Sequence, residues 1–302
     1  MEEHIPGYNQ AVRVLALCRY AGVGPRLFDL LMGRFGSLDA IFAVSASSLH
    51  AIDDLEDDRA EQIRQAETHL GEAQAEYDRL RERDIRIVTR LDAEYPRRFE
   101  ELNDPPPLLY VRGSLPANDR KAVTLAGASD ATAEGIELTV DLARRFAADG
   151  VQVVASLRRG IDAAAHLGAR AAEQGSFAVI ESGLDRIDAA EQLPVAIDAL
   201  RGGGVLSELA PDQGHEQGGF AAANRLLAGL SNAVVVTEIY ADSREALDLV
   251  EFCSQIGKLV FIVAHHRLGP LSDSAAMDRL TEYGAVPLDS PEQADQIIAA
   301  LV

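Results

Sequence analysis

Cysteine, lysine and long apolar runs are all scarce in this chain. Its 302 residues include two cysteines, Cys18 and Cys253, which lie far apart and form no Cys-x-x-Cys motif. Their number and spacing exclude a disulfide framework and a cysteine zinc site, and favour a reducing compartment. No stretch approaches the roughly 20 apolar residues that cross a bilayer. The start MEEHIPGYNQ is acidic and polar, unlike a secretory signal peptide, so we expect a cytoplasmic protein without membrane contact.

Positive charge is also in short supply. The chain has 28 lysines and arginines against 48 acidic residues, a formal charge of −20. Lysine occurs only at 121 and 258, so the cations are almost all arginine. Proteins that bind nucleic acid by neutralising phosphates usually carry the opposite sign. Any phosphate-binding patch here must therefore act against the field of the whole molecule.

The pattern of apolar residues changes near residue 85, and this change predicts two domains. Hydrophobic residues make up 47% and charged residues 25%, the balance of a folded globular protein. Residues 1–84 show apolar side chains at helical spacing and end in a charged segment, 57–84, that predicts a surface helix. From 85 to 302, short β-branched runs alternate with helical patterns, which is typical of an α/β domain.

Seven runs predict strands of a buried, mostly parallel, doubly wound sheet, since several are apolar on both faces. They are 85–89, 108–112, 122–126, 151–155, 177–180, 233–237 and 259–263. The helix after Thr132 is expected to bury Ile136, Val140, Ala143 and Ala147 and to end at Gly150.

Three glycine-bearing turns follow predicted strands, at 127–135, 156–166 and 181–188. In an open parallel sheet, ligands bind beyond the carboxyl ends of the strands, where helix N-termini offer N–H groups to anions. The turns therefore predict a crest that accepts phosphates or nucleotides. None of them matches the G-x-G-x-x-G fingerprint or a P-loop. With equal weight, these glycines simply turn the chain.

A fourth segment, 218–238, places Asn224 and Arg225 early in a helix that leads to a buried strand. The planar fork of Arg225 suits bidentate recognition of a phosphate over the crest. The alternative is a surface arginine paired with one of the many carboxylates.

From about residue 12 to its C-terminus, the chain resembles the DprA (Smf) family of DNA-processing proteins. The resemblance is carried by AGVGPRLFDLLMGRFGS, YPRRFEELNDPPPLLYVRGSL, RRGIDAAAHLGA, SGLDRI, LSE and NRLLAGLSNAVVVTE, in that order. It implies a helical SAM-like or helix-hairpin-helix-like domain followed by an extended Rossmann domain. It also implies a protein that binds single-stranded DNA and hands it to the recombinase RecA in transformation, as a homodimer and without catalysis or cofactor.

The chain departs from the family pattern at several polar positions. The Gly-Ser-Arg of the first turn is Gly127-Ala128-Ser129 here, and a family arginine before Asn224 is replaced by Ala223. The segment 242–247 replaces a glycine-serine turn, and Arg158 stands where the family has a small residue. We expect Arg158 and Arg159 to replace part of the lost positive charge. With equal weight, they pair with local carboxylates such as Asp130, Glu181 or Asp185.

The residues expected to bind DNA or phosphate follow from the turns and the resemblance together. They are Gly127, Ser129, Thr132, Arg158, Arg159, Gly160, Asp162, Gly183, Asn224 and Arg225.

Other functions remain as alternatives. One is a Rossmann protein that binds a nucleotide or small ligand and has lost DNA binding; another is a scaffold that acts through protein contacts. A hydrolase is not expected, because no G-x-S-x-G elbow is present and His166 is better read as a packed helix residue. His265 and His266 predict a surface loop and no metal site. The turn at 21–25 resembles a helix-hairpin-helix, although its glycines are better explained by a tight bend.

Overall fold

The computed structural model describes residues 8–52, 55–188, 190–214, 218–263, 265–266, 269–270, 272–288 and 294–301. Its contacts divide the chain into two compact units. The first comprises Met1–Tyr95 and Asn103–Tyr110, and the second comprises Pro96–Leu102 and Val111–Val302. The first unit thus reaches further along the chain than the predicted helical domain.

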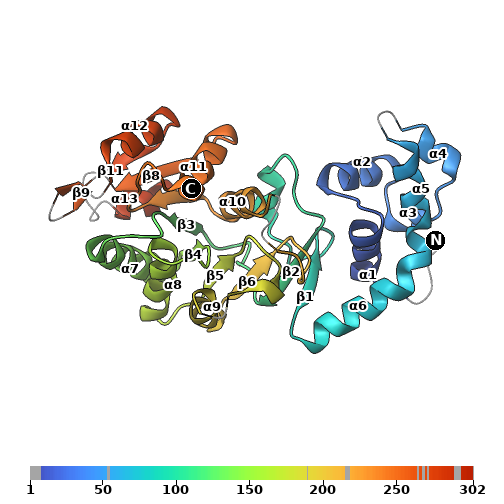
Figure 1. The fold of residues 1–302 in the computed structure, drawn as a ribbon, viewed down its shortest axis with the longest axis horizontal. Helices are drawn as coiled ribbons and strands as arrows, with labels where there is room; N and C mark the ends of the chain where they lie inside the picture. The colour runs from blue at the N-terminus through green and yellow to red at the C-terminus, as the bar shows by residue number, and fades with distance from the viewer. Residues whose placement is uncertain are drawn as a thin grey trace. The chain divides into compact units, whose positions relative to one another are not determined.

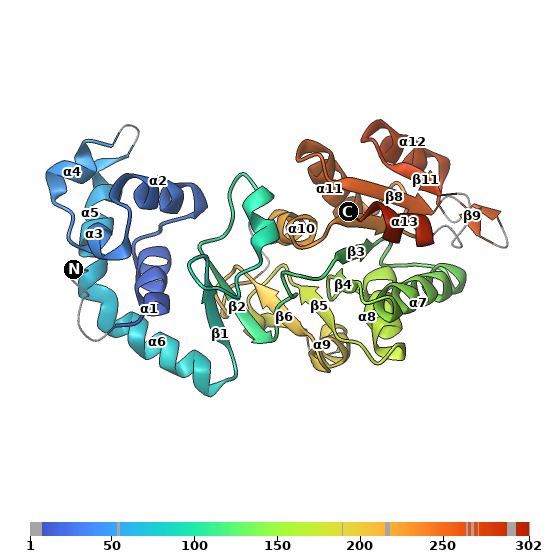
Figure 2. The ribbon, with the colours of Figure 1, turned by 180° about the vertical axis from the view of Figure 1, so that it is seen from behind.

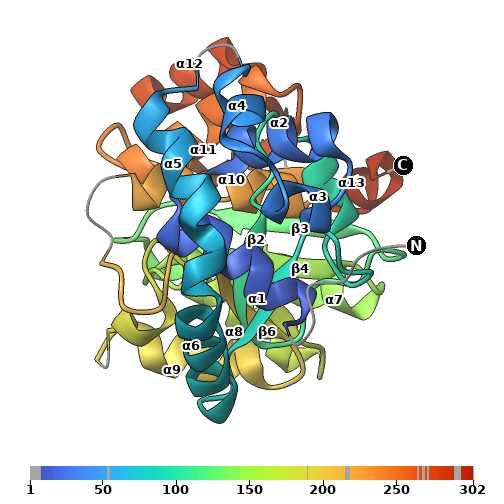
Figure 3. The same cartoon turned by 90° about the vertical axis from the view of Figure 1, so that its right-hand side faces the viewer.

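The first unit is mainly helical, as the blue and cyan elements of Figure 3 show. Its core side chains, among them Leu15, Leu17, Phe28, Leu31 and Ile41, are almost completely buried. Its elements are α1 (Gln10–Leu15), the π-helical turn η1 (Ala16–Tyr20), α2 (Pro25–Phe35), α3 (Leu38–Phe42), α4 (Ala46–His50), α5 (Asp57–Gln65), the 3₁₀ turn η2 (Ala66–His69), α6 (Leu70–Glu82), β1 (Arg86–Thr89) and the start of β2 (Leu108–Gly113).

The charged segment 57–84 corrects one prediction, because it forms two helices and not one. The 3₁₀ turn η2 separates α5, which buries Ala60 and Ile63, from α6, which buries Leu70, Ala73 and Leu80. A 3₁₀ turn rotates the chain more per residue than an α-helix, so four residues add about 80°. This rotation brings the buried stripe of α6 into line with that of α5.

The turn before α2 has the geometry of a tight bend. Gly22 has a φ of +61°, and Pro25 is the first residue of α2. The Arg59 guanidinium covers the turn, with Nη1 donating to the Ala21 and Gly22 carbonyl oxygens at 3.0 and 3.1 Å. A side chain at Gly22 would collide with this guanidinium.

The second unit is built on a parallel sheet with strand order β6-β5-β4-β3-β7-β8-β11, and the end of β2 lies beside β6. The chain moves outward from β3 through β4 and β5 to β6, then crosses to β7 on the other side of β3. Its strands are β3 (Ala122–Ala126), β4 (Gln152–Ala155), β5 (Ser176–Val179), β6 (Gly204–Ser207), β7 (Ala233–Val236), β8 (Leu259–Val263), β9 (His265–His266), β10 (Gly269–Pro270) and β11 (Val286–Leu288).

Helices cover both faces of this sheet, so the predicted doubly wound α/β fold is confirmed. In Figures 1 and 2, α7, α8 and α9 lie on one face and α10, α11 and α12 on the other. The helical elements are η3 (Arg97–Glu101), α7 (Ala133–Ala148), α8 (Ile161–Ala171), η4 (Leu184–Arg186), α9 (Gln192–Leu200), α10 (Gly219–Leu230), α11 (Arg244–Gln255), α12 (Ser274–Glu282) and α13 (Ala294–Ala300). None of the described helices has the length and apolar character needed to span a bilayer.

Helix α7 stops at Ala148, just before the predicted terminal glycine Gly150 (φ +79°), and it buries two of the four predicted residues, Ala143 and Ala147. Leu138, Leu142 and Phe146 are buried against the sheet, whereas Ile136 and Val140 are only half-buried. Helix α7 also packs closely against α8. The absence of a side chain at Gly168 of α8 allows this approach, since a Cβ there would lie 2.4 Å from the Val140 carbonyl oxygen.

All seven predicted strands are present, each within one residue or so of its expected bounds. Two strands of the main sheet were missed. β6 begins in a run of three glycines, and β11 is three residues long and contains Pro287. Of the predicted histidine loop, the backbone of residues 265–266 forms β9, paired antiparallel with β10.

A core substitution tests this packing. We expect Leu142→Ala to lower the free energy of unfolding by about 2–5 kcal/mol, because Leu142 is 1% exposed and its loss leaves a cavity. Leu259→Ala is the matched control, since Leu259 is 46% exposed, and it should cost well under about 1 kcal/mol. Urea denaturation followed by circular dichroism measures both. Equal losses would contradict the assignment of the core.

Candidate functional site at the carboxyl edge of the sheet

The loops after β3, β4, β5 and β7 all leave the same edge of the second unit's sheet, because these strands are parallel. Residues 127–132 follow β3, 156–160 follow β4, 180–183 follow β5 and 237–243 follow β7. The winding of the chain reverses between β3 and β7, which is where open α/β sheets generally bind ligands.

The N-terminus of α7 is occupied by a carboxylate of the protein itself. Glu238 is completely buried, and its carboxylate accepts hydrogen bonds from the Thr132 amide (3.0 and 3.2 Å), the Thr132 hydroxyl (2.8 Å) and the Tyr240 hydroxyl. Burial and the hydrogen bond to Glu238 raise the pKa of Tyr240 to about 12, so its hydroxyl stays protonated and donates. Gly135 leaves the room that this carboxylate fills. A helix N-terminus favours a nearby anion, and at α7 the Glu238 carboxylate already supplies it beside Thr132.

Three of the predicted glycines bring backbone segments into close contact. Gly160 has a φ of +73°, and a Cβ there would lie 2.3 Å from the Ala128 carbonyl oxygen. A Cβ at Gly127 would approach the Glu238 carbonyl oxygen to 2.5 Å, and one at Gly183 would approach the Ala210 carbonyl oxygen to 2.0 Å. These glycines are therefore required for packing between loops.

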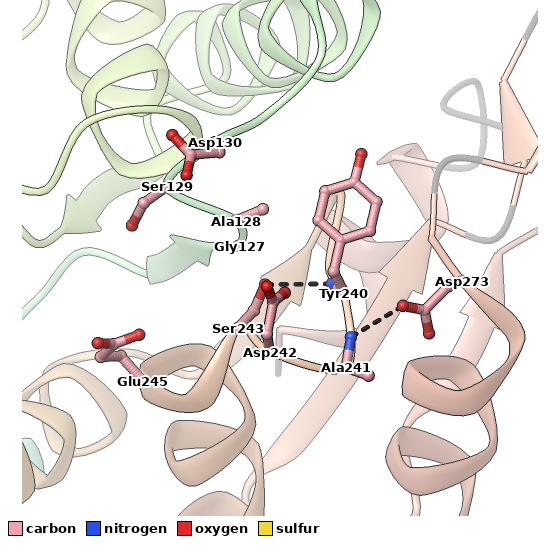
Figure 4. Close-up of a pocket in the computed structure, with 10 residues that line it drawn as sticks. All are labelled: Gly127, Ala128, Ser129, Asp130, Tyr240, Ala241, Asp242, Ser243, Glu245 and Asp273. Atoms are coloured by element: carbon pink, nitrogen blue, oxygen red, sulfur yellow. Dashed lines mark hydrogen bonds between the residues drawn. The ribbon is translucent and has the colours of Figure 1, made fainter.

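One cavity, of about 570 Å³, lies at the ends of β3 and β7; we call it the acidic cavity. Figure 4 shows Ser129 and Asp130, on the loop after β3, on one side and the segment from Tyr240 to Ser243 on the other. Its carboxylates are Asp130, Asp242, Glu245 and Asp273, and no arginine or lysine is among the residues that line it. Two of its walls are fixed locally, since the Tyr240 amide donates to Ser243 Oγ and the Ala241 amide to Asp273.

A second cavity, of about 770 Å³, lies at the ends of β4 and β5; we call it the arginine cavity. Three arginines line it, together with four carboxylates, polar side chains and one aromatic ring. These are Arg158, Arg159, Arg186, Glu181, Asp188, Glu191, Glu245, Ser129, Ser182, Gln192 and Phe220. The two cavities share Ser129 and Glu245.

Arg158 is held in a buried network on the wall of the arginine cavity. Its Nε donates to Ser156 Oγ at 2.9 Å and to Asp162 Oδ2 at 2.8 Å, and Ser156 Oγ also donates to Asp162. Burial alone would lower the pKa of Arg158, but Asp162, with Glu181 and Glu245, raises it, so the guanidinium stays charged. Arg158 Nη2 and Asp162 Oδ1 are buried without a hydrogen-bond partner among the described residues.

The other predicted polar residues also have partners within the protein. Arg159 is exposed and pairs with Asp130 at 2.7 Å. Arg225 pairs with Glu208, and Asn224 Nδ2 donates to the Glu245 carbonyl oxygen at 3.1 Å. Both lie in the middle of α10, later than predicted, and neither lines the two cavities. Arg158 and Arg225 are therefore not brought together around either of these two cavities, and each pairs with a carboxylate nearby.

His166 is a packed residue of α8, as predicted. It is 1% exposed, with Nδ1 2.8 Å from Ser176 Oγ and Nε2 2.9 Å from the Ser156 carbonyl oxygen. Burial lowers the pKa of its imidazole, which favours the neutral form. Cys18 and Cys253 are free thiols. The described part of the chain contains no cluster of three or more potential metal ligands.

Sequence reasoning missed Glu238, Glu181 and Phe220. Glu238 has a local signal, because it directly follows a buried strand at the carboxyl edge of the sheet. Glu181 stands at the start of a predicted turn but was considered only as a partner for an arginine. Phe220 lies near the beginning of the segment that includes Asn224 and Arg225, of which only these two polar residues were expected in the site.

The comparisons with known proteins agree with this fold. The family model described as DNA recombination-mediator protein A matches residues 86–301. The chain belongs to this family. Protein Smf of Synechocystis sp. is 27% identical over 94% of this chain and 75% of its own length, and DNA processing protein DprA of Bacillus subtilis is 25% identical over 70% and 71%. The predicted resemblance is thus confirmed.

Two solved structures of DprA proteins have the same fold. That of Streptococcus pneumoniae has a TM-score of 0.75 at 23% identity and covers 95% of this chain and 97% of its own. That of Helicobacter pylori, described for its single-stranded DNA binding mode, has a TM-score of 0.59 at 23% identity, with 71% and 96% covered. At these identities the structures show the fold alone.

The buried carboxylate at the start of α7 yields a prediction. We expect Glu238→Gln to lower the free energy of unfolding by about 2–4 kcal/mol, because charge-assisted hydrogen bonds from Thr132 and Tyr240 are lost inside the protein. Glu137→Gln, at an exposed position of α7, should change it by less than about 0.5 kcal/mol. Denaturant unfolding measures both variants. If Glu238→Gln unfolds like the parent protein, the carboxylate does not organise this turn.

Proposed function

We propose that the protein binds single-stranded DNA at the carboxyl edge of the second unit's sheet and passes it to RecA as a homodimer, without catalysis. The observation that carries this proposal is the family match over residues 86–301, which span the sheet whose edge bears the arginine cavity. The single-stranded DNA binding described for the Helicobacter pylori relative supports the choice of ligand.

Among the described residues that line the arginine cavity, the exposed cations available for phosphates are Arg159 and Arg186. Both are exposed at the arginine cavity; Arg159 pairs with the exposed Asp130, and Arg186 Nε donates to the Asp212 carbonyl oxygen at 2.8 Å. Ion pairs between exposed groups are worth little, so a phosphate can compete with Asp130 for Arg159. Arg158 and Arg225, in contrast, are each paired with a carboxylate in a largely buried setting.

Two accessible cations imply a weak dependence on salt. Each phosphate that is neutralised on a single strand contributes about −0.7 to the slope of log K against log salt. Two contacts therefore give a slope of about −1.4. The charge of −20 on the whole molecule further opposes long-range attraction of the strand.

The two arginines provide the test. We expect the double variant Arg159→Ala/Arg186→Ala to bind oligonucleotides more weakly and to bring the slope close to zero, because both phosphate contacts are removed. Fluorescence anisotropy across a salt series measures the slope. Arg144→Ala is the matched control, since Arg144 is exposed and pairs with Asp141 at 3.2 Å but lies on α7, away from the cavity lining. It should leave the slope unchanged.

Failure to bind oligonucleotide even at low salt would refute the proposal. A rise in melting temperature with mononucleotides but no oligonucleotide binding would favour the small-ligand alternative. The proposed transfer to RecA is tested by whether the protein accelerates RecA filament formation on single strands. Light scattering coupled to gel filtration tests the homodimer.

A further inference from the structure

Arg159 and Asp130 form an ion pair that joins two loops of the carboxyl edge. Arg159 Nη2 lies 2.7 Å from Asp130 Oδ1, and the two side chains are 59% and 82% exposed. Arg159 belongs to the loop after β4 and lines the arginine cavity, whereas Asp130 belongs to the loop after β3 and lines the acidic cavity. In Figure 4, Asp130 lies with Ser129 on one side of the acidic cavity. The pair therefore connects the linings of the two cavities.

The Asp130 carboxylate occupies the kind of position on Arg159 that a phosphate of a bound strand would take. Carboxylates and phosphates accept hydrogen bonds from a guanidinium in the same way. If both approached Arg159 together, two negative charges would lie close to each other and repel. A phosphate that contacts Arg159 Nη2 must therefore displace Asp130 or make a weaker contact.

A second carboxylate of the same edge shows how a structural anion differs from Asp130. Glu238 also binds the loop after β3, but it is completely buried and accepts hydrogen bonds from both the amide and the hydroxyl of Thr132. Asp130 is mostly exposed to water, so its carboxylate loses little when it turns away from Arg159. The pair between Asp130 and Arg159 is therefore readily reversible.

We propose that Asp130 is an autoinhibitory group, which competes with the phosphates of single-stranded DNA for Arg159 and so lowers the affinity for the strand. This inference rests on the proposed binding of single-stranded DNA and adds a group that limits its strength. A strand that is passed on has to dissociate, and a carboxylate held beside Arg159 takes over the contact as the phosphate leaves. The effect of Asp130 is therefore expected mainly on the rate of dissociation.

Asp130→Asn tests this directly, because it removes the charge and keeps the size of the side chain. Exposed ion pairs contribute about 1.4- to 5-fold to the equilibrium constant. The full-length variant should therefore bind a run of thymidines about threefold more tightly than the parent protein at low salt. The gain should shrink as salt rises, because salt screens exposed pairs. Fluorescence anisotropy measures the affinity, and a chase with unlabelled strand measures the dissociation rate, which should fall.

Asp242→Asn is the matched control. Asp242 is another exposed carboxylate of the acidic cavity and lies on the side opposite Asp130 in Figure 4. The control variant makes the same change in net charge but leaves the partner of Arg159 in place. It should raise the affinity less than Asp130→Asn does.

A double-mutant cycle decides whether the effect passes through Arg159. In the Arg159→Ala background, where Arg186 still contacts the strand, Asp130→Asn should tighten binding no more than Asp242→Asn does. An equal gain with and without Arg159 refutes the competition, because Asp130 would then act only by long-range repulsion. Circular dichroism verifies that each variant is folded. Asp130→Ala, which also lacks the carboxylate, repeats the test if Asp130→Asn does not fold.

The outcomes separate this inference from the function on which it rests. If the parent protein and Asp130→Asn bind the strand equally, Asp130 does not limit the affinity; the inference fails and DNA binding stands. A gain no larger than that of Asp242→Asn has the same meaning. If none of these proteins binds the strand even at low salt, the proposed function is refuted, and the inference with it.

Discussion

The carboxylate of Glu238 connects the loop after β3 to the loop after β7, at the centre of the carboxyl edge of the sheet. It lies at the point where the winding of the chain reverses, and its hydrogen bonds fix the first turn of α7 to the end of β7. The Glu238 carbonyl oxygen accepts from the Ala128 amide at 2.8 Å, so the backbone joins the same two loops again. The acidic cavity forms around this junction, and it takes the place at which a nucleotide phosphate would sit in many related folds.

This arrangement divides the edge into two regions with different chemistry. Between β3 and β7, the helix N-terminus is satisfied and the lining carries carboxylates without a cation. Beside β4 and β5, the lining of the arginine cavity holds three arginines, among them the largely buried Arg158 and the exposed Arg159. Four carboxylates lie among them. The strand proposed to bind here would therefore gain little from ionic attraction, in keeping with the formal charge of −20.

Much of the fold is predictable from sequence because buried parallel strands are apolar on both faces and stand out between amphipathic helices. β6 and β11 lack that signature: the first starts among glycines that let Gly203 and Gly204 approach neighbouring backbone, and the second is short. The break between α5 and α6 was also hidden, because a 3₁₀ turn changes the rotation of the chain without changing its composition.

The candidate site was less predictable than the fold. Sequence placed Ser129, Arg158 and Arg159 near one edge, and the structure finds all three on one cavity. It did not reveal which of 48 acidic residues pair with which arginine, since partners such as Arg225 and Glu208 meet only through the tertiary fold. The burial of Glu181 on the wall of this cavity is likewise not encoded in any local pattern.

The contact at Gly160 has a consequence for the kinetics of the site. Here the loop after β4 rests directly on the backbone of Ala128 and Ser129, with no side chain between them. Because two main chains touch here, one loop cannot move toward the other without displacing its backbone. The walls of the arginine cavity that these loops form are therefore preformed, so an incoming strand meets them as they stand. For the strand proposed to bind here, the rate of association would then depend on the encounter itself and not on a prior opening of these loops.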